Sequence, residues 1–239
     1  MALPYFYTEP ISSINNIIVL NEENSKHIVQ VLRMQAGRQL KLTDGLGSIY
    51  TAEITDAHKK KCVVKIIDSE KIPTVQPTVC IAISPVKNNS RFEWFLEKAT
   101  EIGVSQIVPI ICERTEKQFL KFERLKGILI SAMLQSQQAW LPVLQEPITL
   151  EKFVKDNKSD NKFIAHCEEQ NKVSLRDLIS HTDKKESSVS TILIGPEGDF
   201  SPGEIKIALL NNFNPVSLGE TRLRTETAAI VAATLLFVY

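Results

Sequence analysis

The sequence predicts an α/β protein in which a mostly parallel sheet carries helices on both faces and follows a small β-rich domain. From residue 78 onward, short apolar runs alternate with helical patterns, as in consecutive βαβ units. Before residue 72, apolar and polar positions alternate with a period of two, which favours antiparallel strands. The length of 239 residues suits one large domain, or a medium domain together with a small one. We expect these domains at residues 1–72 and 73–239.

The small domain is predicted from "RQLKLTDGLGSIYTAEITDAHKKKCVVKIIDSEK", where "DGLG" is a tight turn between alternating strands. One short helix is expected in "SKHIVQVLRMQAG", because Ile28, Val31 and Leu32 have helical spacing and Gly37 stands where a helix would stop. The stretch "KIPTVQP" (71–77) contains two prolines and is interpreted as a linker.

The larger domain begins with the strand pattern "TVCIAISPV" and a helix in "RFEWFLEKATEIG". Ser90 and Glu93 fit a capping box, and Gly103 marks the helix end. The apolar face of this helix is expected to contain Phe92, Phe95, Leu96, Ala99 and Ile102. The same reasoning predicts strands in "QIVPII", "NKFIAHC", "VSTILIG" and "NPVSLG", and helices at about 121–138 and in "SLRDLIS", "SPGEIKIALLNN" and "TETAAIVAATLLFVY".

Composition excludes several classes of protein. Hydrophobic residues make up 43% and charged residues 23% of the chain, an ordinary balance for a soluble protein. No stretch is long enough to span a bilayer, and the first residues lack a secretory pattern. We therefore expect a cytoplasmic protein. The formal net charge is zero, which argues against nucleic-acid affinity from overall charge. A local basic face is still open, at "HKKK" (58–61), which we interpret as a solvated hairpin tip, or at the arginines near position 222.

Cysteine and histidine patterns do not predict a metal site. No two cysteines form a Cys-x-x-Cys pair, and each lies in or beside an apolar run, so we expect buried structural thiols at all four. The four cysteines are Cys62, Cys80, Cys112 and Cys167. The histidines are scattered, and no His-x-x-x-His is present.

The stretch "IGPEGDFS" (194–201) predicts a loop that leaves a strand and enters a helix. Ser201 is a natural N-cap, Pro202 suits the first helical position, and Glu204 completes a capping box. Ligands of parallel sheets bind at the carboxyl ends of strands, where this loop would lie. Gly195 and Gly198 would leave room for a closely approaching backbone or flat ligand. A tight turn explains the same residues equally well.

A second loop, "SLGETRLRTETAA", favours a binding pocket. It leaves a strand at Leu218 and Gly219 and enters a helix near 225–227, with Glu220, Arg222, Arg224 and Glu226 inside it. Two glycine-containing loops at the carboxyl ends of strands suggest one shared pocket. Neither matches the phosphate loop or the dinucleotide-binding fingerprint.

These two motifs, "LIGPEGDFSPGEI" and "SLGETRLRTETAAI", resemble the RsmE family, the 16S ribosomal RNA uracil-N3 methyltransferases of the SPOUT superfamily. "RFEWFLEKATEIGVSQIVPIICERT" and "HIVQVLRMQAG" are similar to other parts of that family, so the resemblance extends over nearly the whole chain.

The resemblance implies a PUA-like β-barrel that helps to hold RNA, a SPOUT domain with a carboxyl-terminal trefoil knot, and a homodimer. It implies S-adenosyl-L-methionine as the cofactor and 3-methyluridine at position 1498 of the small-subunit RNA as the product. The cofactor residues carried over are Ile194, Gly195, Pro196, Glu197 and Gly198 from the first loop, Leu218, Gly219, Leu223, Arg224 and Thr225 from the second, and His166 from a third.

The sequence departs from the family pattern at two places. Leu134 and Gln138 stand where many members carry charged residues, so some RNA or cross-subunit contacts would differ. Thr221 occupies a position where many members place an arginine, and Arg222 follows it. Arg224 is therefore the stronger candidate for a functional arginine.

Methyl transfer to uracil N3 needs no metal, but the N3 proton must leave and the negative charge on the carbonyls must be stabilised. A guanidinium suits the second task, and Arg224 is our candidate, although an ion pair with Glu226 or a phosphate contact is open. Glu197 or Glu226 could accept the proton, and we favour a capping role for Glu226.

Because N3 lies on the Watson–Crick edge, the target uridine must be unpaired or flipped out. Candidate RNA-binding residues are Arg33, Lys87, Arg91 and Arg222. Two alternatives are a catalytically inactive RNA-binding assembly factor of the same fold, and a magnesium-dependent nucleotide enzyme that uses the "GPEGD" carboxylates.

Overall fold

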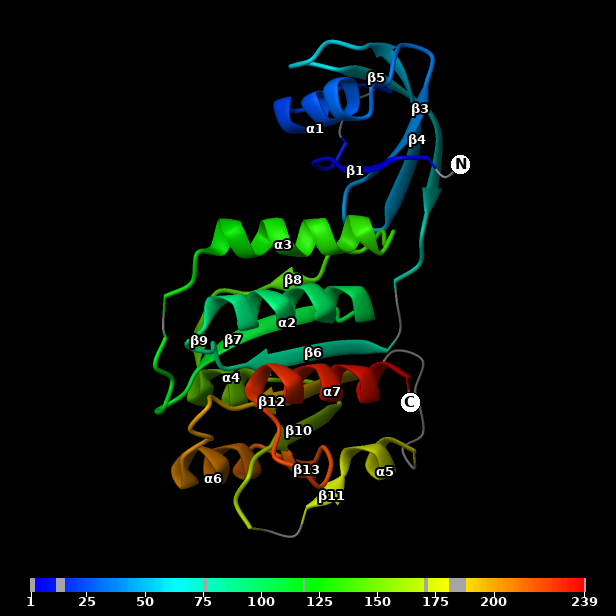
Figure 1. Ribbon diagram of the computed structural model, residues 1–239. Coiled ribbons are helices and arrows are strands. Elements are labelled where there is room, and N and C mark those ends of the chain that lie inside the picture. Colours follow the sequence, from blue (N-terminus) through cyan, green and yellow to red (C-terminus); the bar gives the residue numbers. More distant parts are fainter. Residues whose placement is uncertain are drawn as a thin grey trace. The chain divides into compact units, whose positions relative to one another are not determined.

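The computed structural model describes residues 3–11, 16–74, 77–117, 119–169, 172–180 and 188–238. The chain divides into two compact units (Figure 1). One comprises Met1–Thr74 with Met133–Leu141, and the other comprises Val75–Ala132 with Pro142–Tyr239. The return of residues 133–141 to the first unit was not predicted from the sequence.

The first unit is built on a sheet of order β1-β3-β4-β5-β2. β1 is parallel to β3 and the other pairs are antiparallel. The strands are β1 (Tyr5–Tyr7), β2 (Ile17–Val19), β3 (Gln39–Thr43), β4 (Ser48–Asp56) and β5 (Val63–Lys71). The "DGLG" turn joins β3 to β4 as predicted, because the Asp44 carboxylate accepts hydrogen bonds from the backbone N–H groups of Leu46 and Ser48. "HKKK" is an exposed turn between β4 and β5.

The predicted helix of the first unit differs from its expected form. α1 (Glu22–Lys26) runs directly into a π-helical turn, η1 (His27–Val31). The wider turn rotates the later residues away from the core, so Ile28 is buried while Val31 is 68% exposed. The helix stops before Gly37, and Arg33 already has a left-handed backbone with φ of 51°.

Residues 133–141 pack against the β3–β4 turn of the same unit. The indole N–H of Trp140 donates to the carbonyls of Ile72 and Pro73 at 3.2 and 3.0 Å, and the ammonium of Lys71 lies 5.6 Å from the ring centroid. Gly47 has φ of 86°, and any side chain there would collide with the Trp140 ring. Gln138, one of the two residues that depart from the family pattern, lies in this segment and its carbonyl accepts a hydrogen bond from the Tyr5 hydroxyl.

The second unit contains the predicted parallel sheet, in the order β11-β13-β10-β12-β6-β7-β8, with β9 paired to β7. Every pair in it is parallel. The longer strands match the apolar runs of the sequence, whereas β8, β9 and β11 have two residues each and were not predicted. The strands are β6 (Thr78–Ile83), β7 (Gln106–Ile111), β8 (Val143–Leu144), β9 (Ile148–Thr149), β10 (Asn161–Ala165), β11 (Val173–Ser174), β12 (Val189–Ile194) and β13 (Asn214–Ser217).

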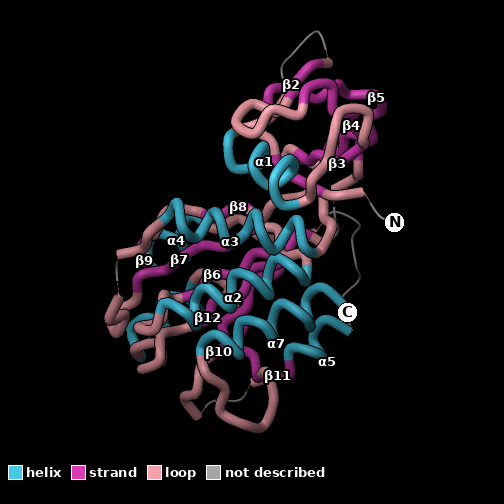
Figure 2. The backbone as a smooth tube through the Cα atoms, turned by 45° about the horizontal axis from the view of Figure 1, so that its top comes forward, coloured by secondary structure: helices cyan, strands magenta, loops and turns pink. Residues whose placement is uncertain are grey.

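Helices cover both faces of this sheet, as the alternating pattern predicted (Figure 2). On one face α2 and α7 contact each other, and α7 contacts β6 and β12. On the other face, α4 and α6 share a buried cluster with β6, β7, β10 and β12. The helices are α2 (Asn89–Ile102), α3 (Phe122–Gln135), α4 (Leu150–Asp156), α5 (Leu175–Ser180), α6 (Pro202–Leu210) and α7 (Thr225–Val238). No described helix is long and apolar enough to cross a bilayer.

Helix termini follow the predicted signals with one exception. Ser201 and Glu204 form the reciprocal capping box of α6, and Gly103 ends α2 with φ of 103°. At the start of α2, however, the cap is Asn88, whose side chain accepts the N–H of Ser90. The predicted box of Ser90 with Glu93 is wrong, because the Glu93 carboxylate instead accepts two hydrogen bonds from Arg124 in α3, at 2.6 and 2.9 Å.

The packing of α2 yields a stability prediction. Phe95 is fully buried, whereas the adjacent Trp94 on the same helix is 44% exposed. Phe95→Ala leaves a cavity and should lower the free energy of unfolding by about 3–5 kcal/mol. Chemical denaturation checks this, with Trp94→Ala as the matched control. Equal losses for the two variants would contradict the packing described.

Candidate ligand-binding site

The loops after three strands meet at one edge of the parallel sheet. β12 and β10 are in register with Ile194 beside Ala165, and β10 and β13 are in register with Ala165 beside Val216. Because the strands are parallel and each ends at this level, the chain leaves all three at the same edge. The two glycine-containing loops and the loop at His166 are therefore neighbours in space.

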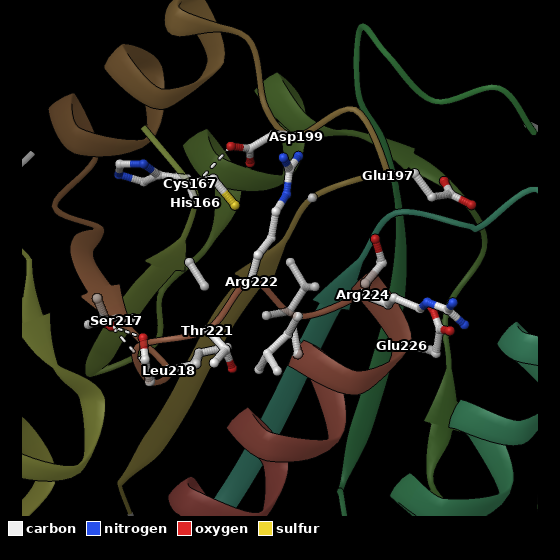
Figure 3. A pocket seen from close by; sticks show the side chains of 18 of the residues that line it. His166, Cys167, Glu197, Asp199, Ser217, Leu218, Thr221, Arg222, Arg224 and Glu226 are labelled. Carbon is white, nitrogen blue, oxygen red and sulfur yellow. Dashed lines mark hydrogen bonds between the residues drawn. The ribbon is translucent and has the colours of Figure 1, made fainter. Parts of the chain in front are cut away.

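These loops enclose a cavity of about 680 Å³ (Figure 3). This volume lies within the range of about 300–1,000 Å³ that is usual for small-molecule sites. Residues from the ends of β10, β12 and β13 line it, together with the start of α7 and Arg91 from α2. The predicted site residues that line it are Arg91, His166, Ile194, Gly195, Pro196, Glu197, Leu218, Gly219, Arg222, Leu223, Arg224 and Thr225.

Three predicted site residues do not line the cavity. Gly198 faces the side chain of Arg114, and Lys87 forms a surface ion pair with Glu116 at 2.9 Å. Arg33 lies in the first unit. Binding roles for these three residues stay predictions.

Asp199 ties the first loop to the loop at His166. Its backbone is left-handed, with φ of 63°, and its N–H donates to the carbonyl of Pro196 at 2.9 Å. One carboxylate oxygen accepts the backbone N–H of Cys167 at 2.8 Å (Figure 3). The Asp199 carboxylate therefore fixes the spacing of two walls of the cavity.

The glycines of the two loops serve different purposes. At Gly195 a Cβ atom would come within 3.1 Å of the Phe200 ring, so the buried ring requires the absence of a side chain. At Gly219 a Cβ atom would meet nothing within 4 Å, but φ of 145° is unfavourable for other residues. A close approach is thus found at Gly195, chiefly by the Phe200 side chain with its backbone nitrogen at 3.3 Å, and the second loop keeps an open face at Gly219.

Charges on the cavity wall are mixed. The buried Glu226 carboxylate lies 3.6 Å from the Arg91 guanidinium, which accounts for Arg91 without RNA. Glu197 is exposed, and its carboxylate accepts the backbone N–H of Lys87 at 3.0 Å. Arg224 is exposed and forms no ion pair within the part of the chain that the structure describes. The simpler role considered for Arg224, pairing with Glu226, is therefore not seen.

Among the described residues, the side chain of His166 is buried and its ring nitrogens have no hydrogen-bond partner. The residue is 7% exposed. Burial lowers the pKa of the imidazole, and the nearby positive charge of Lys172 lowers it further. The Lys172 ammonium donates to the His166 carbonyl at 2.6 Å. His166 lines the cavity, but both ring nitrogens are themselves buried and do not face its open space.

Three further cavity residues, Asp199, Lys172 and Cys167, were not predicted as site residues. Asp199 stands inside the "IGPEGDFS" motif, so its position could have indicated it, but no sequence signal marks Lys172. Cys167 also corrects the expectation of four buried thiols, because it is exposed while the other three are buried. It lies just past the end of β10, outside the apolar run.

Both carboxylates named in the magnesium alternative take part in joining the loops. The carboxylates of "GPEGD" already accept backbone N–H groups, Glu197 from Lys87 and Asp199 from Cys167. Among the described residues, no three histidine, cysteine, aspartate or glutamate side chains are grouped to hold a metal ion.

The fold and the cavity define an α/β protein that binds a small molecule at the carboxyl edge of a parallel sheet. Comparison with known families identifies residues 74–237 as an RNA methyltransferase domain and residues 20–67 as an RNA methyltransferase PUA domain. The chain therefore belongs to the RsmE family of RNA methyltransferases.

Relatives of similar length support this assignment. The ribosomal RNA small subunit methyltransferase E of Rickettsia conorii is 29% identical over 91% of this chain and 88% of its own. A probable rRNA methyltransferase structure from Porphyromonas gingivalis is 42% identical, covers 99% of both chains and superposes with a TM-score of 0.89. A putative methyltransferase from Legionella pneumophila, solved with bound S-adenosylmethionine, is 30% identical over 99% of this chain and 97% of its own, with a TM-score of 0.85.

A third solved structure carries the family name directly. The ribosomal RNA small subunit methyltransferase E of Neisseria gonorrhoeae, bound to S-adenosylmethionine, is 26% identical. It matches 97% of this chain and 95% of its own, with a TM-score of 0.84.

The state of His166 predicts a pH dependence. The folded chain holds the imidazole pKa below its ordinary value of 6.5, so on acidification the unfolded chain binds the proton first. The contribution of neutral His166 to stability is present above pH 6.5 and declines below it. Unfolding free energies measured between pH 7.5 and 5 should fall less steeply in His166→Asn. Identical slopes would contradict a depressed pKa.

Proposed function

We propose that this protein methylates N3 of a specific uridine in 16S ribosomal RNA, with S-adenosylmethionine as the methyl donor. The observation that carries the proposal is the cavity where the "LIGPEGDFSPGEI" and "SLGETRLRTETAAI" loops meet at the carboxyl edge of the sheet. Relatives that match more than nine tenths of the chain are named ribosomal RNA small subunit methyltransferase E, and two related structures hold S-adenosylmethionine.

The residues present fit S-adenosylmethionine on three observations. The cavity has the volume of a small-molecule site. The backbone at Gly219 faces open space, where a ligand can lie close to it. The wall also carries both signs of charge, as a ligand with a carboxylate, an ammonium and a sulfonium requires. Leu218, Gly219, Ile194 and Pro196 would hold the ligand through backbone and apolar contacts.

When bound, S-adenosylmethionine supplies an electrophilic methyl group on a sulfonium, which a positioned nucleophile displaces in line. The nucleophile, uracil N3, carries a proton between two carbonyls. The protein must therefore hold the base, accept or pass on the N3 proton, and stabilise the negative charge that spreads onto the carbonyl oxygens.

Arg224 is suited to that stabilising role. Its guanidinium is exposed on the cavity wall, and no carboxylate of the described residues neutralises it. It can present several N–H donors to a developing oxyanion. Glu197 is the candidate proton acceptor from the sequence, although its bond from the Lys87 N–H also joins two loops. Glu226 is a weaker candidate, because Arg91 already pairs with it.

RNA would approach with the target uridine unpaired, since N3 is hidden in a base pair. The candidate phosphate contacts are Arg222, an exposed residue of the cavity wall, and Arg33 in the first unit. Lys87 and Arg91 are each paired with a carboxylate and would have to exchange partners to bind phosphate. A homodimer, a carboxyl-terminal trefoil knot and a cytoplasmic location belong to the same proposal.

The proposal is tested on the RNA itself. In cells that lack this protein, mass spectrometry of 16S ribosomal RNA should show loss of one 3-methyluridine. Re-expression of the protein should restore it. An unchanged modification profile would reject the proposed activity, and RNA binding without methylation would favour an inactive assembly factor.

Arg224→Ala tests the catalytic assignment. Loss of a donor to a developing oxyanion should lower kcat by about 10²–10³-fold, while the affinity for S-adenosylmethionine changes much less. Radiolabelled methyl transfer to small subunits and calorimetric titration measure the two quantities. In the comparison variant Arg222→Ala we expect a higher KM for RNA with kcat nearly retained. Unchanged kcat in Arg224→Ala would remove this residue from the mechanism.

A further inference from the structure

The first cavity loop is held from behind by a segment that does not line the cavity. This segment, residues 112–115, follows β7 and precedes α3. We propose that it is a positioning strap for the cofactor loop and that Arg114 is its positioning residue. The inference rests on the proposed function only in taking S-adenosylmethionine as the ligand of the cavity.

Arg114 contacts the loop with both ends of its side chain. Its guanidinium donates to the carbonyl of Gly198 at 2.7 Å and lies 3.5 Å from the carbonyl of Phe200. A Cβ atom on Gly198 would lie 3.4 Å from the Arg114 Cδ and 3.5 Å from its Cβ, so the aliphatic stem lies against the loop. Gly198 therefore leaves room for the Arg114 side chain and does not face the cavity.

A second contact fixes the same two segments. One oxygen of the Glu204 carboxylate accepts the backbone N–H of Ser201 at 2.8 Å, as part of the α6 capping box. The other oxygen accepts the backbone N–H of Glu113, also at 2.8 Å. A single carboxylate thus caps the helix that ends the loop and joins that helix to the residue before Arg114.

The strap is itself anchored to the sheet. The Thr115 hydroxyl accepts the backbone N–H of Cys112 at 2.8 Å, and it lies 2.8 Å from the Ser84 hydroxyl at the end of β6. Thr115 and Ser84 are both buried. Because these bonds hold residues 112–115 against the sheet, the Arg114 side chain is held in place, and its hydrogen bond holds the Gly198 carbonyl of the loop in place as well.

Loop position matters because Ile194, Gly195 and Pro196 form the cavity wall, and Asp199 links that wall to Cys167. The Gly198 carbonyl lies between these residues in the chain. Without its donor, the loop can rotate at Gly198, and the wall would be less well formed for binding. The expected consequence is weaker ligand binding with little change in the chemical step.

The test uses the full chain and three substitutions at one position. Arg114→Ala removes the stem and the donor, Arg114→Met keeps the stem, and Arg114→Lys keeps a cation with a single donor group. Calorimetric titration with S-adenosylmethionine should give a Kd about ten-fold higher for the alanine and methionine variants, the order expected for one charge-assisted hydrogen bond. The lysine variant should recover part of the affinity. Arg124→Ala, which removes an exposed arginine paired with Glu93, is the matched control and should keep the wild-type Kd.

Measurements of KM and kcat distinguish a positioning role of Arg114 from a general loss of structure in its variants. In the Arg114 variants the KM for S-adenosylmethionine should rise while kcat at saturating donor stays within about two-fold, whereas partial unfolding would lower kcat and the calorimetric stoichiometry. A Kd in Arg114→Met within two-fold of wild type overturns the proposal. This result is decisive even if Arg114→Ala does not fold. A wild-type chain that binds the donor but methylates no uridine contradicts the proposed function, not the strap.

Discussion

The parallel register of β10, β12 and β13 is the constraint on which the site depends. Ala165, Ile194 and Val216 lie side by side across three strands, so the chain emerges from each strand at one level. This pairing brings His166, Gly195 and Gly219 together from positions far apart in the sequence. The sheet is stabilised by apolar residues on both faces, and the helices that bury those residues also keep the loops at one edge.

Hydrogen bonds from backbone groups then give the loops their shape. Three carboxylates accept most of these backbone N–H groups. Asp199 accepts the N–H of Cys167, and Glu197 accepts the N–H of Lys87. Glu204 accepts the N–H groups of Ser201 and Glu113. An acidic residue used in this way needs no catalytic role to explain its presence in a motif. The group left for chemistry on the cavity wall is the exposed Arg224 guanidinium, which has no ion-pair partner among the described residues.

Local patterns explain which elements could be predicted. Long apolar strands and the capping box of Ser201 with Glu204 depend on neighbouring residues, and both were found as expected. The Ser90 box failed because Glu93 has a distant partner, Arg124, which no local rule includes. The helical spacing of Ile28 and Val31 predicted a helix here but not its π-helical turn, in which Ile28 is buried and Val31 is exposed. The strands of two residues have no periodicity to detect.

The parts of the site differ in how far neighbouring residues in the sequence reveal them. The two glycine-containing loops could be predicted from the sequence, because the signals of a loop and of the helix start that follows it are adjacent in the chain. The pairing of Arg91 with Glu226 was not, because it joins α2 to α7 across more than half of the second unit's sequence. Lys172 gave no signal, since one lysine in a polar stretch resembles any other.

The Trp140 segment has a consequence for how this protein can be divided. The first unit is not one continuous stretch, because residues 133–141 belong to it and the chain crosses between the units at three points. The Trp140 indole donates to the carbonyls of Ile72 and Pro73, and its ring fills the space beside Gly47. A swap of amino-terminal modules among relatives would have to exchange this tryptophan-bearing insert together with residues 1–74, as a matched pair.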